Sequence, residues 1–151
     1  MFFDKEVMLF NEDVQSSTEI ITILSDKLKD RKIVNDEFLK HALKREKEFP
    51  TGLATNGIGV AIPHTDSKYV NESQIAFASL KNPIKFKSMV DLNQDVSVSL
   101  VFMIAMASPH EQAGLLSKLM GLFQVPEELD KLKACKTKEE VISILHNHEI
   151  D

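Results

Sequence analysis

Apolar residues follow two different spacings along the chain, and these spacings separate the expected helices from the expected strands. Spacings of three and four residues predict helices at 16–28, 35–48, 108–123, 126–132 and 137–145. Short apolar or alternating runs predict strands at 7–10, 57–63, 74–80, 84–87 and 96–106. Between them, segment 51–56 and the Asn82-Pro83 pair have the composition of turns.

Polar residues at the start of three predicted helices have the spacing of N-terminal caps. Ser16 lies three residues before Glu19, and Ser108 lies three residues before Glu111, so both pairs are expected to form capping boxes. Asn35 is expected to cap the second helix with its side-chain oxygen.

The apolar pattern also indicates how the elements are layered. Residues 96–106 become continuously apolar, which is typical of a central strand covered on both faces. Helices and strands interleave along the chain, which predicts an α/β fold: a central mixed sheet of four or five strands with helices on both faces. In the last helix, Val141, Ile142 and Leu145 are expected to face the core.

The composition is that of one globular domain, which we expect to comprise residues 1–151. The formal net charge of −5 disfavours a nucleic-acid partner. The N-terminus lacks a signal-peptide pattern, and the longest apolar run, 100–107, is far shorter than the roughly 20 residues that span a bilayer. The single cysteine, Cys135, cannot form an internal disulfide. We therefore expect a cytoplasmic protein with no membrane insertion.

The strongest candidate for chemistry is His64, which follows Pro63 at the end of the predicted strand 57–63. Proline cannot continue a central ladder and has a fixed φ, so the chain leaves the sheet there with little backbone freedom. A histidine held at a strand end can act as a nucleophile or base. Asp66 or a backbone carbonyl can hold one ring nitrogen as N–H, which leaves the other free to attack. The alternative is a surface histidine without a chemical role.

Two further residues each have a functional and a structural interpretation. His110 lies in the first turn of a predicted helix, where free backbone N–H groups and the helix dipole attract anions. Arg45 lies in the last turn of the second helix, and its guanidinium can pair with phosphate oxygens. The alternative for both is a solvated helix end.

Several motifs are rejected on their sequence. Gly57-x-Gly59 lacks a third glycine and precedes its strand, so it is not a dinucleotide fingerprint, and no P-loop sequence occurs. His110-Glu111 lacks the second histidine of a zinc-protease helix. His146-x-His148 has no cysteine partners, and Cys135 has no catalytic pattern around it. We therefore expect neither a metal nor a cofactor.

Segment 57–64, which reads GIGVAIPH, resembles the phosphorylation-site motif of the fructose/mannitol class of enzyme IIA domains. These domains belong to the bacterial sugar phosphotransferase system. Arg45-Glu46 followed by 50–53 (PTGL) is similar to the upstream Arg-Glu and Thr-Gly elements of this class. Segment 108–112 (SPHEQ) followed by Leu115-Leu116 is similar to its second motif block.

The resemblance extends from about Val7 to Leu145. It is greatest to the galactitol-type branch, through the segments 49–52 (FPTG), 61–65 (AIPHT) and 120–124 (MGLFQ). The chain differs from the mannitol type in a longer stretch between the Arg-Glu element and the histidine motif.

The resemblance implies a phosphotransferase that carries phosphohistidine. In this family the phosphocarrier protein HPr passes a phosphoryl group to the enzyme IIA histidine. Enzyme IIA passes it to a cysteine of the IIB component, and the membrane IIC component imports the sugar. His64 is thereby implied to be the phosphoryl acceptor and donor, and Arg45 and His110 are implied to support it.

A carrier that meets two proteins briefly needs a small, modestly apolar surface around its histidine. Ile58, Ile62 and Met89 are candidates for this surface. Two other functions compete with transport. One is a regulatory domain of the same fold whose phosphorylation controls a protein partner, and the other is a small-ligand binding module without covalent chemistry.

Overall fold

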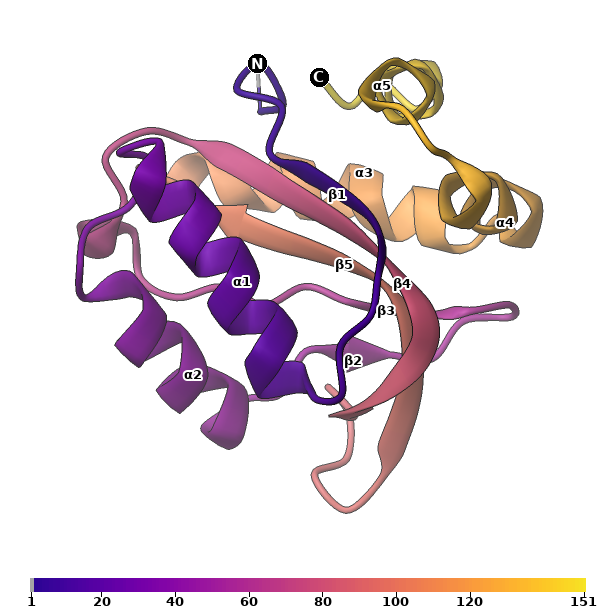
Figure 1. The fold of residues 1–151 in the computed structure, drawn as a ribbon, viewed down its shortest axis with the longest axis horizontal. Coiled ribbons are helices and arrows are strands. Elements are labelled where there is room, and N and C mark those ends of the chain that lie inside the picture. Colours follow the sequence, from indigo (N-terminus) through magenta and orange to yellow (C-terminus); the bar gives the residue numbers. More distant parts are fainter. Residues whose placement is uncertain (1) are drawn as a thin grey trace.

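The computed structural model describes residues 2–151, apart from the side chains of Gln112 and Ala113. The elements are β1 (Met8–Glu12), α1 (Ser17–Asp30), α2 (Phe38–Glu48), β2 (Gly52–Leu53), β3 (Gly59–Ala61), the 3₁₀ helix η1 (Ser67–Tyr69), β4 (Gln74–Lys87), β5 (Asp95–Ala105), α3 (Pro109–Phe123), α4 (Pro126–Ala134) and α5 (Lys138–Asn147) (Figure 1). None of the helices formed by residues 2–151 has the length and apolar composition that a membrane span requires.

The strands form one mixed sheet of five strands in the order β1-β4-β5-β3-β2. β1 runs parallel to β4, and β3 runs parallel to β5. β4 and β5 are antiparallel, as are β2 and β3. The prediction that residues 96–106 form a central strand is confirmed, because two strands of the sheet lie on each side of β5.

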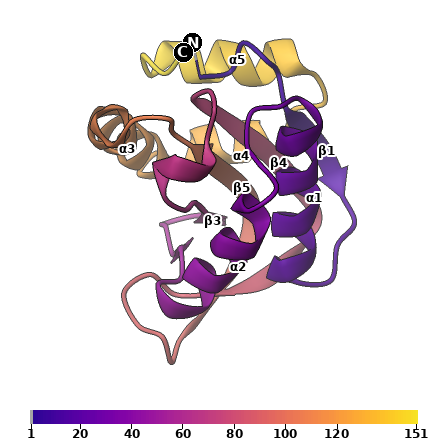
Figure 2. The same ribbon diagram turned by 90° about the vertical axis from the view of Figure 1, so that its left-hand side faces the viewer.

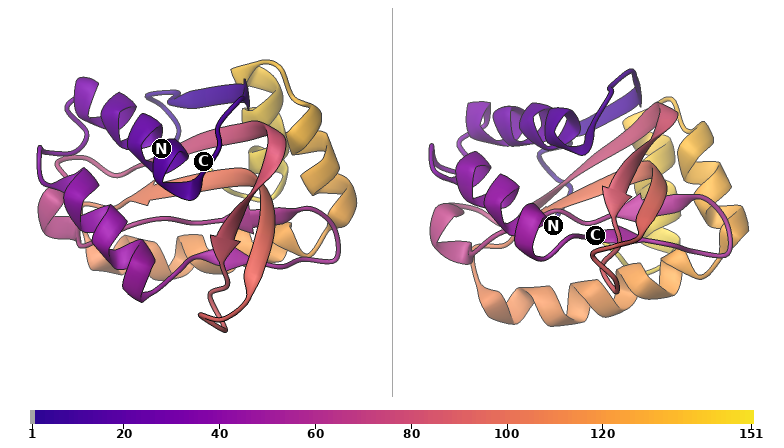
Figure 3. Two further views of the ribbon diagram at one scale, coloured as in Figure 1. Left: turned by 60° about the horizontal axis from the view of Figure 1, so that its bottom comes forward. Right: turned by 90° about the horizontal axis from the view of Figure 1, so that it is seen from below.

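Helices cover both faces of this sheet. α1 and α2 lie on one face, and α3, α4 and α5 lie on the other (Figures 2 and 3). Val101 and Phe102 are consecutive in β5 and fully buried, and they belong to opposite apolar clusters. Successive strand residues point to opposite faces, so a strand covered twice needs apolar residues at both. The predicted α/β class with helices on both faces is confirmed.

The prediction for β4 is wrong at its middle. Instead of two strands joined by a turn at Asn82-Pro83, β4 is continuous, and its register against β5 shifts between Ser79 and Ile84. The pairing with β1 ends at Leu80, so beyond that point β4 is bonded on one side only. A proline lacks a backbone N–H, and a bulge on a one-sided strand accommodates it.

The cap predicted at Asn35 is also wrong. α2 begins at Phe38, and Glu37 occupies the N-cap position without a side-chain cap bond. The Asn35 Oδ1 instead accepts a hydrogen bond from the Glu37 N–H at 3.0 Å, which forms a turn before the helix.

The two predicted capping boxes differ in outcome. Ser16 caps α1 by accepting the Glu19 N–H at 3.2 Å, as predicted, but the Glu19 carboxylate accepts the Gln15 N–H at 2.8 Å instead of the Ser16 N–H. Ser108 occupies the N-cap position of α3, but its side chain makes no cap bond. The Glu111 carboxylate accepts a hydrogen bond from the Ser73 hydroxyl at 2.8 Å, so it anchors α3 to the start of β4. In α5, Ile142 is exposed rather than facing the core.

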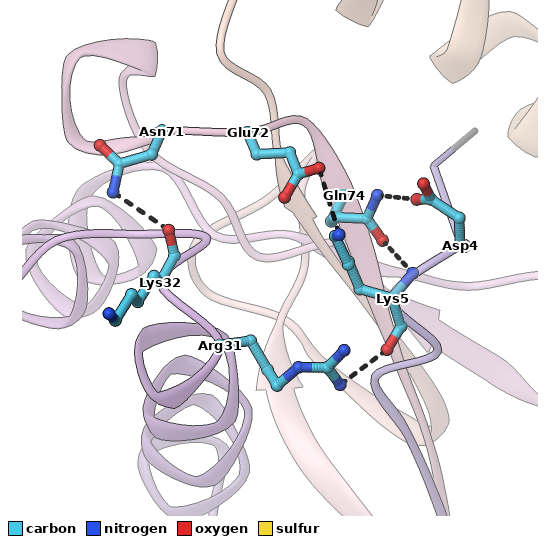
Figure 4. A network of polar contacts seen from close by, with 7 residues as sticks. All are labelled: Asp4, Lys5, Arg31, Lys32, Asn71, Glu72 and Gln74. Atoms are coloured by element: carbon cyan, nitrogen blue, oxygen red, sulfur yellow. Dashed lines mark hydrogen bonds and ion pairs between the residues drawn. The ribbon is translucent and has the colours of Figure 1, made fainter.

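A polar network fastens the N-terminal segment to the sheet and to α1 (Figure 4). The Gln74 side chain accepts the Lys5 N–H at 3.1 Å and donates to the Asp4 carboxylate. The Lys5 carbonyl accepts from the Arg31 guanidinium at 2.9 Å, and the Lys5 ammonium lies 3.8 Å from the Glu72 carboxylate. The two ends of the chain lie side by side (Figure 1).

Candidate functional site

His64 lies at the carboxyl ends of the parallel strands β3 and β5. Pro63 is buried and accepts a hydrogen bond from the Ile104 N–H at 3.0 Å, while His64 pairs with Ile104 in an isolated parallel bridge. Because proline has no N–H, the ladder cannot continue on its other side, and the chain leaves the sheet after His64. The strand-end position predicted for this histidine is therefore the one that the structure has.

One nitrogen of the His64 ring has a defined partner. Nδ1 lies 2.8 Å from the Ile62 carbonyl oxygen. A carbonyl only accepts hydrogen bonds, so Nδ1 carries the proton and Nε2 carries the lone pair in the neutral ring. Of the two partners left open by the sequence, Asp66 or a backbone carbonyl, the structure selects the carbonyl.

The surroundings of His64 favour its neutral form. Burial lowers the pKa of the ring below its ordinary value of 6.5, and the positive charge of Arg45 lowers it further. The hydrogen bond to the Ile62 carbonyl and the negative charge of Asp66 act in the opposite direction but are outweighed. A neutral imidazole with Nε2 unprotonated can act as a nucleophile near pH 7.

The structure brings Arg45, from the last turn of α2, to His64. Both residues line two adjoining hollows of about 320 and 500 Å³. The Arg45 Nε is buried and has no hydrogen-bond partner among residues 2–151, and the guanidinium carbon lies 5.4 Å from the centre of the Phe49 ring. Because Arg45 lines both hollows, its guanidinium can pair with an anion held there.

His110 lies beside the site. It is not among the described residues that line the two hollows. Pro109, the first residue of α3, lines the smaller hollow with Asp66 and Lys68, whereas the next residue, His110, is exposed. The Ser73 hydroxyl holds the start of α3, since it accepts the Ala107 N–H at 2.8 Å and donates to the Glu111 carboxylate at 2.8 Å. The supporting role of His110 stays a prediction.

Exposed apolar side chains form the rim of the larger hollow. We call them the apolar rim, and they are Phe49 (62% exposed), Met89 (39%), Val90 (89%) and Leu92 (53%). Phe49 follows α2, and the other three belong to the loop between β4 and β5, at the lower end of the view in Figure 1. Clustered apolar residues on a surface are typical of an interaction site.

The sequence predicted only part of this surface. Of the three candidates, Met89 belongs to this surface, whereas Ile62 is only 2% exposed and Ile58 is partly buried against the core. Val90 and Leu92 were missed, although apolar residues in a segment rich in Asp and Asn are a signal that could have found them.

The described part of the chain has no group of three His, Cys, Asp or Glu side chains arranged to hold a metal ion. Of the two histidines near the C-terminus, His148 lies 3.4 Å from the Glu128 carboxylate. Cys135 is buried and donates to the Lys131 carbonyl at 3.2 Å, and burial raises the pKa of its thiol.

Known proteins of similar sequence include a sugar-transport component and a transcriptional regulator. The chain is 31% identical over 115 residues to the PTS system galactitol-specific EIIA component of Escherichia coli strain K12, which covers 76% of each chain. It is 29% identical over 144 residues to the transcriptional regulator ManR of Bacillus subtilis strain 168, which covers 94% of this chain and 20% of ManR.

The fold is shared with solved enzyme IIA structures. Enzyme IIAMtl, in its complex with phosphorylated enzyme IIBMtl from Escherichia coli, matches with a TM-score of 0.77 and 20% identity over 94% of this chain and 95% of that chain. Residues 1–148 match the family model described as phosphoenolpyruvate-dependent sugar phosphotransferase system, EIIA 2. The family expected from segment 57–64 is thus confirmed, and the chain belongs to the EIIA type 2 family of the sugar phosphotransferase system.

Proposed function

We propose that His64 accepts a phosphoryl group from phosphorylated HPr and passes it to a cysteine of a IIB component during sugar or alditol uptake. The protein is a phosphotransferase of the sugar phosphotransferase system. The observation that carries the proposal is the hydrogen bond from Nδ1 of His64 to the Ile62 carbonyl, which leaves Nε2 as the attacking nitrogen beside Arg45. In this proposal residues 1–151 act as one phosphocarrier domain in the cytoplasm.

The transfer needs no change in the proton on Nδ1. The Nε2 lone pair of His64 attacks phosphorus, a new N–P bond forms, and the N–P bond to HPr breaks with its electron pair leaving on the HPr histidine. The phosphorylated ring is then an imidazolium, and its Nδ1–H stays on the Ile62 carbonyl. Attack by the IIB thiolate forms an S–P bond and returns His64 as neutral imidazole.

Arg45 supplies the charge complement for this step. A phosphoryl group at Nε2 would lie in the hollow that Arg45 lines, where the guanidinium can pair with an equatorial oxygen. Such catalysis depends on positioning and on stabilising negative charge. His110 is proposed to add a second donor from the start of α3.

The apolar rim is the proposed docking surface for both protein partners. It adjoins His64 and combines exposed apolar side chains with the charged residues Glu48 and Asp91 of the same hollow. The relative IIAMtl forms a complex with phosphorylated IIBMtl, which supports a IIB partner for this chain. The galactitol-specific relative supports galactitol or a related alditol as the transported compound.

A regulatory role is the second candidate, because the match to ManR covers 94% of this chain but only 20% of that regulator. A single assay separates the two roles. The protein is incubated with phosphoenolpyruvate, enzyme I and HPr, and then mixed with purified galactitol-type IIB. Transport predicts that the label moves to the IIB cysteine within the mixing time. Label that stays on the chain would support the regulatory role.

The same assay tests the two histidines. We expect His64→Ala to take up no label while remaining folded. We expect His110→Ala to take up label but to transfer it more slowly. Unchanged transfer in both directions by His110→Ala would remove this histidine from the site.

A further inference from the structure

We infer that Glu46 is a positioning residue for His64, because it fixes, through Thr51 and Ile62, the carbonyl that selects the attacking ring nitrogen. This inference rests on the proposed function of His64. It assigns a role to a carboxyl group that does not itself touch the phosphoryl group.

The first link joins Glu46 to Thr51. The Thr51 N–H donates to Glu46 Oε2 at 2.8 Å, and the Thr51 hydroxyl donates to Glu46 Oε1 at 2.8 Å. Thr51 is only 2% exposed, so both donors are removed from bulk water. Glu46 therefore holds the backbone and the side chain of Thr51 at the same time.

The second link joins Thr51 to His64. The Thr51 carbonyl accepts the Ile62 N–H at 3.3 Å, and the Ile62 carbonyl accepts Nδ1–H of His64 at 2.8 Å. In an extended strand the N–H and C=O of one residue point to the same side. The position of Thr51 therefore sets the direction of the Ile62 carbonyl toward the ring.

This anchor matters because the local sheet is short. β2 contains only Gly52 and Leu53, and it pairs with a β3 of three residues. On the other side β5 holds the flanking residues, since Ala61 pairs with Val101 and the Pro63 carbonyl accepts the Ile104 N–H. The bonds at Thr51 are therefore what fixes the Ile62 carbonyl from the β2 side. The same segment also holds the apolar rim, because the Gly52 carbonyl accepts the Met89 N–H at 2.8 Å.

The Glu46 carboxyl group that holds Thr51 is itself largely buried. Burial raises the pKa of Glu46 to about 7, although both hydrogen bonds from Thr51 lower it. An acid in this position is costly to keep charged, and the two hydrogen bonds from Thr51 offset part of that cost. A neutral amide of the same shape should keep most of this geometry.

The test compares Glu46→Ala, Glu46→Gln and the control Lys47→Ala, which changes an exposed residue in the same helical turn. The ring tautomer of unphosphorylated His64 is read from its ¹⁵N chemical shifts. We expect wild type, Glu46→Gln and Lys47→Ala to keep Nδ1–H, and Glu46→Ala to show a clear fraction of Nε2–H. The initial rate of phosphorylation by HPr should fall about tenfold in Glu46→Ala and recover to within about twofold in Glu46→Gln.

A second pair of variants covers the case in which Glu46→Ala fails to fold. Thr51→Val removes one donor at nearly constant volume, and Thr51→Ser keeps it. We expect the tautomer change in the valine variant and not in the serine variant. Folded Glu46→Ala or Thr51→Val with the wild-type tautomer and rate would overturn the inference. Wild-type protein that takes up no phosphoryl group would instead overturn the proposed function. The tautomer measurement is independent of that outcome, because it is made on unphosphorylated His64.

Discussion

At the scale of single residues, the site depends on which form of the His64 ring exists at neutral pH. Burial and Arg45 lower the pKa of His64 below 6.5, so the neutral ring should predominate at pH 6.5 and above. We expect an NMR titration of His64 to give a midpoint below 6.5. Replacing Arg45 with Met should move this midpoint upward, because a positive charge near the ring is lost. A midpoint at or above 6.5 in wild type would contradict this electrostatic description.

The raised pKa of Glu46 gives a second prediction, which concerns how the unfolding free energy depends on pH. Its pKa is raised from 4.5 to about 7, so the folded protein holds the proton over a range in which the unfolded chain has released it. The resulting stabilisation is complete below pH 4.5 and is lost as the pH rises through about 7.

The measurement is urea unfolding of wild type and Glu46→Gln at pH 5 and pH 7.5. From pH 5 to pH 7.5 we expect the wild type to lose on the order of 2 kcal/mol of unfolding free energy relative to Glu46→Gln. Equal pH dependence of the two proteins would show that Glu46 titrates normally in the fold.

Residue types and their place in the pattern made His64 and Arg45 candidates, and the family resemblance then favoured both over a surface histidine and a solvated helix end. A proline at a strand end and a cation at a helix end are local signals. The partner of Nδ1 was not predictable, because Asp66 and the Ile62 carbonyl are both two residues from His64. The choice depends on where β2 places Thr51, which is a tertiary relation.

At the scale of elements, β2 depends on a close approach that only glycine permits. A Cβ atom on Gly52 would lie 2.6 Å from the Lys87 carbonyl oxygen, which belongs to backbone that cannot move aside easily. We expect Gly52→Ala to lower the unfolding free energy by about 2 kcal/mol or more. Gly52→Ala should also slow phosphorylation. A shift of Gly52 would move Thr51, whose carbonyl holds Ile62 and thereby the acceptor of the His64 Nδ1–H.

Gly121→Ala is the matched control, since a Cβ atom at this helical position meets nothing within 4 Å. There we expect a stabilisation of about 0.5–1 kcal/mol from the better helix propensity of alanine. Urea unfolding of both variants makes the comparison. A Gly52→Ala protein as stable as wild type would mean that β2 does not need this close approach.

Three local features were not predicted correctly, because of short length in one case and tertiary contacts in the other two. β2 has two residues, which is too short for any periodicity to appear. The signal of Asn82-Pro83 is strong for a turn, but one-sided pairing of β4 lets a bulge take its place. Ser108 had the right spacing for a capping box, but Glu111 finds Ser73, which is distant in sequence and close in space.

At the scale of the whole molecule, the apolar rim should be the surface that partners bind. We expect Val90→Asp to slow phosphoryl transfer from HPr by about tenfold, because a charge in an apolar contact must be desolvated without a partner. The control is Ile142→Asp, which changes another exposed apolar residue on α5. Transfer rates and heteronuclear NMR titrations with HPr measure the effect. Equal losses in the two variants would show that the rim is not the specific surface.

The layered architecture was predictable because it depends on patterns that each segment carries by itself. β5 is apolar on both of its faces, and helices alternate with strands along the chain. These local patterns alone indicate a sheet with helices on both faces. The apolar rim was not predictable as a unit, because Phe49 and the loop that contains Val90 come together only through a tertiary contact between β2 and the segment after β4. Gly52 bridges Ser88 in the folded protein, which brings these two segments together.

The most direct measurement is mass spectrometry of the protein after incubation with phosphoenolpyruvate, enzyme I and HPr, under conditions that preserve phosphohistidine. We expect one added phosphoryl group that maps to His64, is lost in acid, and is absent from His64→Ala. A phosphoryl group on another residue, an acid-stable modification, or full labelling of His64→Ala would contradict the account.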